Sequence, residues 1–225
     1  MCGRVNVIDN PGLVQLLRDL GIDLGLPTLV NVAPTERLSV VLERDHQRSI
    51  DSARWWLTPA WASEVNQKYA MFNARSETLA TSRAFSKPFR SQRGIVPVSS
   101  FIEWRKEGDI KQPFLISSAS GAFAMAALWE VWHGGEAPLL TCTLVTTAAA
   151  PAFQPWHHRM PVVLAPQEYD VWLDNSRALE PHDEMFSPRL KEPWSVCPLS
   201  RTASNARNKD PQVMESIGEA VVLAA

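Results

Sequence analysis

The chain begins Met1-Cys2-Gly3-Arg4, and Cys2 is the residue there best suited to covalent chemistry. A small residue at position 2 permits removal of Met1, which would leave Cys2 with a free α-amine and a thiol. Their reference pKa values are about 7.7–8.0 and about 8.5, so each has a reactive form near neutral pH. An aldehyde suits this pair, because the amine condenses with it to an imine and the thiolate then closes a thiazolidine ring. The alternative is an ordinary buried cysteine, since free cysteine often packs as a small core residue.

Glu103 is a candidate for proton transfer, because it follows the apolar run 95–98 and stands between Ile102 and Trp104. Such a setting is expected to raise the pKa of a carboxyl group toward a value useful for general acid–base catalysis. A salt-bridged glutamate on an edge strand, next to the basic pair that follows it, is an equally good interpretation of these residues alone.

Two further polar segments are candidates for binding and catalysis. In the segment 157–161, His-His-Arg-Met-Pro, imidazole and guanidinium groups precede an apolar run. This combination suits acid catalysis near an anion, although one such histidine is more often structural. The segment 73–78, Asn-Ala-Arg-Ser-Glu-Thr, is mostly polar. By itself it is equally typical of a solvated loop that starts a helix, since these residues favour caps and turns.

The elements that must hold these residues follow from the periodicity of the apolar positions. Asn10 and Pro11 before an amphipathic run predict a helix that ends near Gly21, and further helices are predicted at 166–173 and 210–217. Short apolar or alternating runs predict a largely antiparallel sheet system. Because the sequence has no repeat or linker, one α+β domain is expected over residues 1–225. The predicted strands are 38–42, 49–56, 113–116, 122–129, 139–146 and 160–164.

The composition of the chain limits the classes of function that we expect of this protein. A net charge of -2 does not favour a protein that coats nucleic acid by bulk electrostatics, so contact with DNA would depend on clustered arginines. Neither a secretory signal nor an apolar run near the ~20 residues of a membrane span is present, and a cytoplasmic monomer without membrane contact is expected. The chain has 3 cysteines and no C-x-x-C pair, so neither a metal nor a cofactor is expected.

Six segments in order are more informative than any one of them. They are Met-Cys-Gly-Arg at 1–4, Asn-Val-Ala-Pro-Thr at 31–35, Arg-Trp-x-Leu-x-Pro-x-Trp at 54–61, Asn-Ala-Arg-x-Glu-Thr at 73–78, Phe-x-Glu-Trp at 101–104 and His-x-Arg-Met-Pro at 157–161. Together they resemble the SRAP family (SOS response-associated peptidases, or abasic-site processing proteins) from Cys2 to about Asn208. The resemblance implies a strand-rich α+β domain with a barrel-like core and peripheral helices. It also implies a positively charged cleft for single-stranded DNA with the amino terminus at its floor.

The function that the resemblance implies is a covalent thiazolidine crosslink between Cys2 and an abasic site in single-stranded DNA, formed after removal of Met1. Asn73 would position the terminal amine and the sugar, Glu103 would act as general acid and base, and His157 would assist opening of the deoxyribose. Self-cleavage of the Met1–Cys2 bond and lyase activity on the DNA strand are compatible with this set. The expected DNA contacts are Arg4, Arg75, Arg83 and Arg159 to phosphates, and Trp61 as an aromatic wedge at a base.

The sequence departs from the family pattern at two positions. Trp56 and Ser100 stand where glycine is usual, and Trp56 is interpreted as core packing in preference to a base-stacking group. Cys142 and Cys197 lie in apolar, strand-like runs and are interpreted as inert core thiols. The segment 200–208 resembles the loop that closes the family's site, and no function is predicted for it.

Two other function classes remain open. Amino-terminal-nucleophile hydrolases of the glutamine amidotransferase type also begin Met-Cys-Gly and use the α-amine of Cys2 as the base for its own thiol. They would need glycine-rich amide-binding segments, and this chain has only 10 glycines and no Gly-His or Asn-Gly pair. A non-catalytic reader of damaged or modified DNA would use Cys2 and the arginines for recognition alone. A DNA adduct that survives heat and detergent is expected only of the crosslinking protein.

Overall fold

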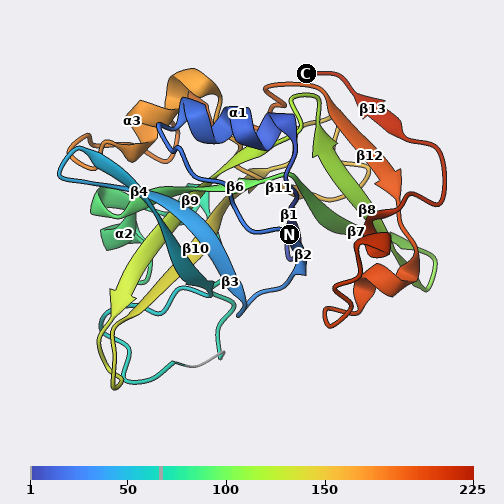
Figure 1. Ribbon diagram of the computed structural model, residues 1–225. Coiled ribbons are helices and arrows are strands. Elements are labelled where there is room, and N and C mark those ends of the chain that lie inside the picture. The colour runs from blue at the N-terminus through green and yellow to red at the C-terminus, as the bar shows by residue number, and fades with distance from the viewer. Residues whose placement is uncertain (1, 66–67) are drawn as a thin grey trace.

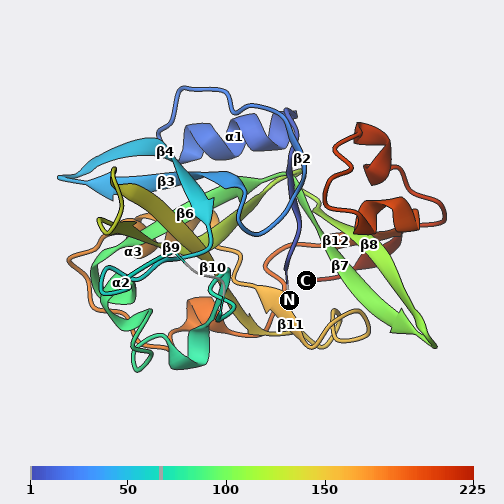
Figure 2. The same ribbon diagram turned by 90° about the horizontal axis from the view of Figure 1, so that it is seen from below.

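The computed structural model of the protein describes residues 2–65 and 68–225, and two sheets form the framework of this part of the chain (Figures 1 and 2). The first sheet joins both ends of the chain, because a pair of strands from the middle of the sequence lies between the two from its end and the two from its start. Its strands in spatial order are β13 (Val221–Leu223), β12 (Trp194–Pro198), β8 (Ile110–Ser118), β7 (Ser100–Glu107), β1 (Val5–Val7) and β2 (Leu29–Val32).

The second sheet closes on itself. Its path is β11 (Arg159–Pro161), β10 (Leu139–Ala148), β4 (Gln47–Trp55), β3 (Arg37–Arg44), β6 (Arg93–Val98) and β9 (Phe123–Trp132). Because β9 also pairs with β10, five of these strands form a closed ring. The short β5 (Asn73–Arg75) pairs with β10. All pairings are antiparallel except those of β10 with β4 and β5, so the predicted α+β fold with mainly antiparallel sheets is confirmed.

Three α-helices lie outside the sheets: α1 (Pro11–Asp19), α2 (Ser86–Ser91) and α3 (Tyr169–Leu173). Figure 1 shows α1 and α3 along the top of the molecule. The first begins as predicted, since Asn10 Oδ1 accepts a hydrogen bond from Leu13 N–H at 2.9 Å and Pro11 occupies the first turn. The predicted helix at 166–173 is also present, as a 3-10 turn (Pro166–Glu168) followed by α3.

Two predicted elements are shorter than expected. The strand predicted at 160–164 is β11, which ends at Pro161; the chain beyond it follows β9 with hydrogen bonds from Ala126 N–H to Val162 O and from Leu164 N–H to Ala124 O. The helix predicted at 210–217 is one 3-10 turn (Pro211–Met214). It stops there because Ile217 N–H bonds to Pro198 O and so draws the chain back to the first sheet. The other five predicted strands are present with slightly different ends.

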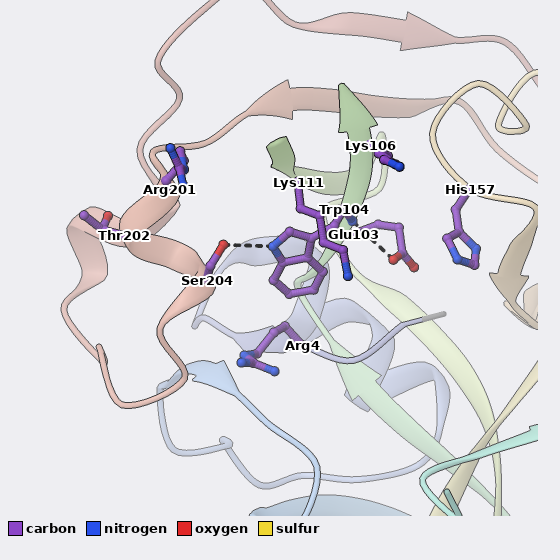
Figure 3. A pocket seen from close by; sticks show the side chains of 9 residues that line it. All are labelled: Arg4, Glu103, Trp104, Lys106, Lys111, His157, Arg201, Thr202 and Ser204. Carbon is purple, nitrogen blue, oxygen red and sulfur yellow. Dashed lines mark hydrogen bonds between the residues drawn. The ribbon is translucent and has the colours of Figure 1, made fainter. Parts of the chain in front are cut away.

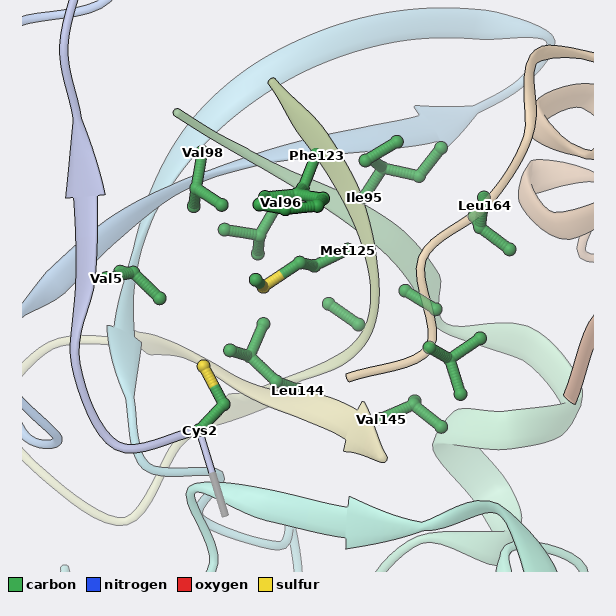
Figure 4. Packing of buried hydrophobic residues seen from close by; sticks show 14 of the residues in the cluster. Cys2, Val5, Ile95, Val96, Val98, Phe123, Met125, Leu144, Val145 and Leu164 are labelled. Carbon is green, nitrogen blue, oxygen red and sulfur yellow. The ribbon is translucent and has the colours of Figure 1, made fainter. Parts of the chain in front are cut away.

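The hydrophobic interior is divided unequally. The main core fills the strand ring and the space under α1 and α3, and it includes Cys2 beside Leu144 and Val5 (Figure 4). A second, small cluster lies on the other face of β7 and consists of Val30, Ile102, Leu199, Ala203 and Val213. The start of the chain is therefore anchored in the main core, whereas the segment after β12 is anchored in the small one.

The positions that depart from the family pattern are both buried. Trp56 packs against Phe72 with ring centroids 5.4 Å apart, so its interpretation as core packing is confirmed. The hydroxyl of Ser100 accepts a hydrogen bond from Asn6 Nδ2 at 3.0 Å. Cys142 is a buried thiol as predicted. The interpretation of Cys197 as a core thiol is wrong, because β12 lies near the edge of its sheet and leaves this residue half-buried.

Candidate active site and nucleic-acid interface

A pocket of about 970 Å³ opens where β1 and β7 meet the segment before β11 (Figure 3). Strands supply one side of this pocket and the loop after β12 supplies the other. It brings together groups from distant parts of the sequence: Arg4, Glu103, Trp104, Lys106, Lys111, His157, Arg201, Thr202 and Ser204.

Cys2 lies behind this pocket, in the extended segment that leads into β1. Its side chain is fully buried, and Sγ is 3.9 Å from the carbonyl oxygen of Arg4. Burial raises the pKa of the thiol well above its ordinary value, and the negative charge of Glu103 raises it further. At neutral pH the group is a thiol and not a thiolate, so its α-nitrogen is the stronger candidate for a first attack once that nitrogen is a free amine.

Asn73 holds the backbone of Cys2. It begins β5, which lies parallel to β10 with Asn73 opposite Leu144. From this position Nδ2 donates a hydrogen bond to Cys2 O at 2.8 Å. Its Oδ1 is buried and accepts no hydrogen bond from the residues that the structure describes. The amide thus fixes the backbone of Cys2 and keeps an acceptor for a further donor.

Glu103 comes from β7, and the pairing of β7 with β1 brings it to the start of the chain, since Val5 lies opposite Phe101. Its side chain is only 4% exposed. The carboxylate accepts a hydrogen bond from Trp104 N–H at 3.2 Å, and Figure 3 shows it pointing toward the ring of His157. A buried carboxylate between a thiol and an imidazole is well placed to move protons between them.

His157 lies just before β11 and is half-buried. Its Nδ1 lies 2.9 Å from Arg159 N and 3.0 Å from Arg159 O, so the backbone of Arg159 holds this side of the ring. Burial lowers the pKa of His157, and the charge of Glu103 opposes this effect. The His158 ring stacks on it at 4.3 Å between centroids. The backbone of Arg159 and the ring of His158 therefore hold the imidazole in one orientation.

Positive charge gathers at the mouth of the pocket. Arg4 lies over the indole of Trp104, 5.6 Å from the ring centroid. Lys106 and Lys111 face each other across the β7–β8 hairpin. Like charges directly opposite each other destabilise a sheet, so this pair is typical of a surface that meets an anion. Arg201 adds a further cation from the opposite side.

The other residues predicted to contact DNA lie outside this pocket. The guanidinium of Arg159 is tied to Glu77 at 2.9 Å and to Thr146 O at 2.7 Å. Trp61 is 55% exposed and stacks with Arg83, whose guanidinium carbon lies 4.2 Å from the ring centroid. Arg75 is exposed at the end of β5. Contacts of these four residues with DNA remain predictions.

Several residues at the site were not predicted from the sequence: Trp104, Lys106, Lys111, Arg201, Thr202 and Ser204. For the lysines a signal exists, because the turn at Gly108 places 106 and 111 opposite each other in a hairpin. For the residues after 200 only the resemblance to a closing loop pointed to the site. Among the residues described, no group of His, Cys, Asp and Glu side chains is arranged to hold a metal ion, and no helix is long and apolar enough to cross a membrane.

Comparison with known proteins agrees with the order of the segments. The sequence model of the family described as SOS response associated peptidase (SRAP) matches residues 1–206. The chain is 31% identical over 226 residues to the abasic site processing protein YoqW of Bacillus subtilis, which covers 96% of this chain and 100% of that protein. It is 32% identical over 194 residues to the abasic site processing protein YedK of Escherichia coli, covering 83% of this chain and 84% of that protein.

Solved structures show the same fold. A crystal structure of a protein from Bacteroides thetaiotaomicron superposes with a TM-score of 0.77 at 21% identity, and the match covers 96% of this chain and 99% of that one. A phage-related protein from Bordetella bronchiseptica has a TM-score of 0.70 at 22% identity. Because the family match extends over nearly the whole chain and a relative above 30% identity is covered in full, the protein belongs to the SRAP family.

Proposed function

We propose that this protein processes abasic sites in single-stranded DNA by bonding Cys2 to the open-chain sugar. One observation supports the proposal: Glu103 and His157 line a pocket whose mouth is lined by cations, and Cys2, held by Asn73, lies buried behind them. The names of the relatives in Bacillus subtilis and Escherichia coli support the substrate, and the phosphates of a DNA strand suit the cationic mouth.

The first step is hydrolysis of the Met1–Cys2 bond, which takes up one water, releases methionine and leaves the α-amine of Cys2 free. Glu103 lies close enough to Cys2 for its charge to act on the thiol, and together with His157 it can transfer the protons. The new amine then lies next to Asn73, whose unused Oδ1 can accept a hydrogen bond from it.

The sugar must open before it can react. A closed abasic deoxyribose is a hemiacetal: the imidazolium form of His157 donates a proton to the ring oxygen, and the proton of the anomeric hydroxyl passes through solvent water back to the imidazole. The product is an aldehyde at C1′ with no net change in atoms. Because the site holds the aldehyde beside Cys2, the next step is effectively intramolecular.

Crosslinking then proceeds in two bond-forming steps. The amine attacks C1′, one water leaves with a proton supplied through Glu103, and an imine forms. The thiol adds across the imine, so that sulfur bonds to C1′ and the thiol proton passes to nitrogen. The sum is a thiazolidine, formed with loss of one water. Before this ring closes, the imine also permits strand cleavage by β-elimination, in which C2′ loses a proton and the 3′ phosphate leaves.

The test is incubation of the purified protein with a single-stranded oligonucleotide that carries one abasic site, followed by a denaturing gel. We expect a shifted band that survives heat and detergent. Cys197→Ala is the matched control, because it removes a thiol that lies on β12 outside the pocket, and it should crosslink like the wild type. A band that dissociates on heating would favour a non-catalytic reader, and glutaminase activity without a band would favour the hydrolase.

A further inference from the structure

Asn31 is buried in β2, the strand at one edge of the first sheet. Its backbone is left-handed, with φ at 51°. Its Nδ2 donates to three carbonyl oxygens far along the chain: Ala203 at 3.2 Å, Asn205 at 3.0 Å and Asn208 at 3.0 Å. Three acceptors around one amide fix its orientation, because the reverse placement would set oxygen against oxygen. One side chain therefore holds a whole turn of backbone.

The segment that Asn31 holds is residues 201–208, which we call the wall loop. It begins with a 3-10 turn (Arg201–Ser204) and forms the side of the pocket opposite β7. Ser204 Oγ accepts a hydrogen bond from Trp104 Nε1 at 3.0 Å, and so joins the loop to the floor of the pocket (Figure 3). Arg201 places its charge on the same side.

The backbone of Asn31 also forms hydrogen bonds with β1 and with Lys209, the residue just after the wall loop. Asn31 N–H donates to Oδ1 of Asn6, in β1, at 2.7 Å, and Asn31 O accepts from Lys209 Nζ at 2.8 Å. Lys209 also pairs with Glu36 at 2.7 Å. Below the loop, Ala203 packs into the small cluster with Val30 and Ile102. Asn31 thus stands between the strand that carries Cys2 into the site and the loop that carries Arg201.

We propose that Asn31 is a positioning residue for the DNA pocket: it acts through the wall loop to hold Arg201 and Ser204 against the bound strand. This role rests on the proposed function, since the charge of Arg201 matters only if the pocket binds phosphate. Asn31 touches none of the reacting groups described above. Its effect is on the affinity and on its salt dependence, and not on the bond-forming steps.

The variant that tests this role is Asn31→Gly. Glycine adopts a φ of 51° without strain, so the backbone bonds to Asn6 and Lys209 can persist while the clamp on the three carbonyls is lost. Asn31→Asp is the second variant, because it keeps the shape but turns a carboxylate oxygen toward the three carbonyl oxygens. Either one should raise amide hydrogen exchange in the wall loop and leave exchange in β7 and β10 unchanged.

A double-mutant cycle separates positioning from a general structural effect. In the wild-type background, Arg201→Ala should weaken binding to an undamaged single strand and reduce the salt slope of log affinity by about 0.7, the value for one lost phosphate contact. In the Asn31→Gly background, the same change should alter neither quantity further. Lys111→Ala is the control, because Lys111 lies on β8, and it should reduce the slope equally in both backgrounds.

Equal effects of Arg201→Ala in both backgrounds would overturn the positioning role. So would unchanged hydrogen exchange of residues 201–208 in both Asn31 variants. If the wild type bound no single-stranded DNA at all, the proposed function would fail instead. The exchange measurement, which needs no DNA, would still decide whether Asn31 holds the loop.

Discussion

The two sides of the pocket are built differently. On one side Cys2, Asn73 and Glu103 are buried, come from β-strands or the segment leading into one, and are backed by the main core. On the other side Arg201 and Thr202 are exposed, and their loop is attached through Asn31 and the small cluster. The groups proposed to react are thus fixed by the strands and the main core, whereas the charge of Arg201 depends on a separate and lighter attachment.

This contrast implies that one substitution can abolish the crosslinking reaction without weakening DNA binding, and that another can weaken binding without slowing the reaction. A change at Cys2 or Glu103 should impair bond formation and spare binding, because phosphate contacts supply most of the affinity for a single strand. A change on the loop side should weaken binding and spare the rate of reaction from the bound state.

Cys2→Ala is expected to abolish the heat-stable adduct while affinity for an undamaged single strand stays close to that of the wild type. Cys2→Ser should also lose the stable product, but its amine can still form an imine, so borohydride should trap a crosslink. Gel analysis with and without borohydride, together with fluorescence anisotropy for affinity, would check both. Full heat-stable crosslinking without a thiol at position 2 would rule out the thiazolidine.

Glu103→Gln is expected to slow adduct formation by about 10²–10⁴-fold, the range for loss of a positioned acid–base group. Because the same proton transfers run in reverse, release of any adduct that forms should slow as well. His157→Ala should slow formation chiefly with a closed sugar, and a substrate that presents a free aldehyde should partly restore its rate. Equal rescue of both variants by the aldehyde, in single-turnover kinetics, would show that the two residues do not divide the steps in this way.

Substitution of one leucine in the main core and one in the small cluster compares how much each contributes to stability. Leu144→Ala, in the main core, should lower the free energy of unfolding by roughly 2–5 kcal/mol, as expected for a large-to-small change in a packed interior. Leu199→Ala, in the small cluster, should cost less globally and instead raise hydrogen exchange in residues 201–213. Urea denaturation and exchange would measure the two effects. Equal global losses would mean that both sides of the pocket belong to one cooperative unit.

The smallest effect concerns pH. Because burial lowers the pKa of His157 in the folded state, the unfolded chain binds a proton more readily. The contribution of neutral His157 to the free energy of unfolding is complete above the pKa of the unfolded chain, about 6.5. It is lost as the pH falls below that pKa and through the lower pKa of the folded protein. His157→Gln should therefore flatten the loss of stability between neutral pH and about pH 5. Thermal melts across this range would detect it, and an unchanged slope would contradict the prediction.

Much of the strand side could be predicted from the sequence, and little of the loop side. Cys2, Asn73, Glu103 and His157 lie in short segments whose order carries the family resemblance. The clamp of Asn31 on Ala203 joins residues 172 positions apart and depends on a left-handed backbone, which no local pattern indicates.

Short strands were hard to predict for a similar reason. β1, β2 and β13 have three or four residues each, so periodicity cannot reveal them, and long-range pairing decides their structure. The half-buried state of Cys197 was missed because its neighbours are apolar on both sides, whereas its exposure depends on where β12 lies in the sheet.

The most direct test of the central claim is the mass of the crosslinked peptide. After reaction with an abasic oligonucleotide, protease and nuclease digestion should yield one modified peptide, the amino-terminal one. We expect it to begin at Cys2, to lack Met1, and to have the mass of peptide plus sugar fragment less one water, with no free thiol at Cys2. Attachment at any other residue, or at a peptide that still carries Met1, would contradict the account.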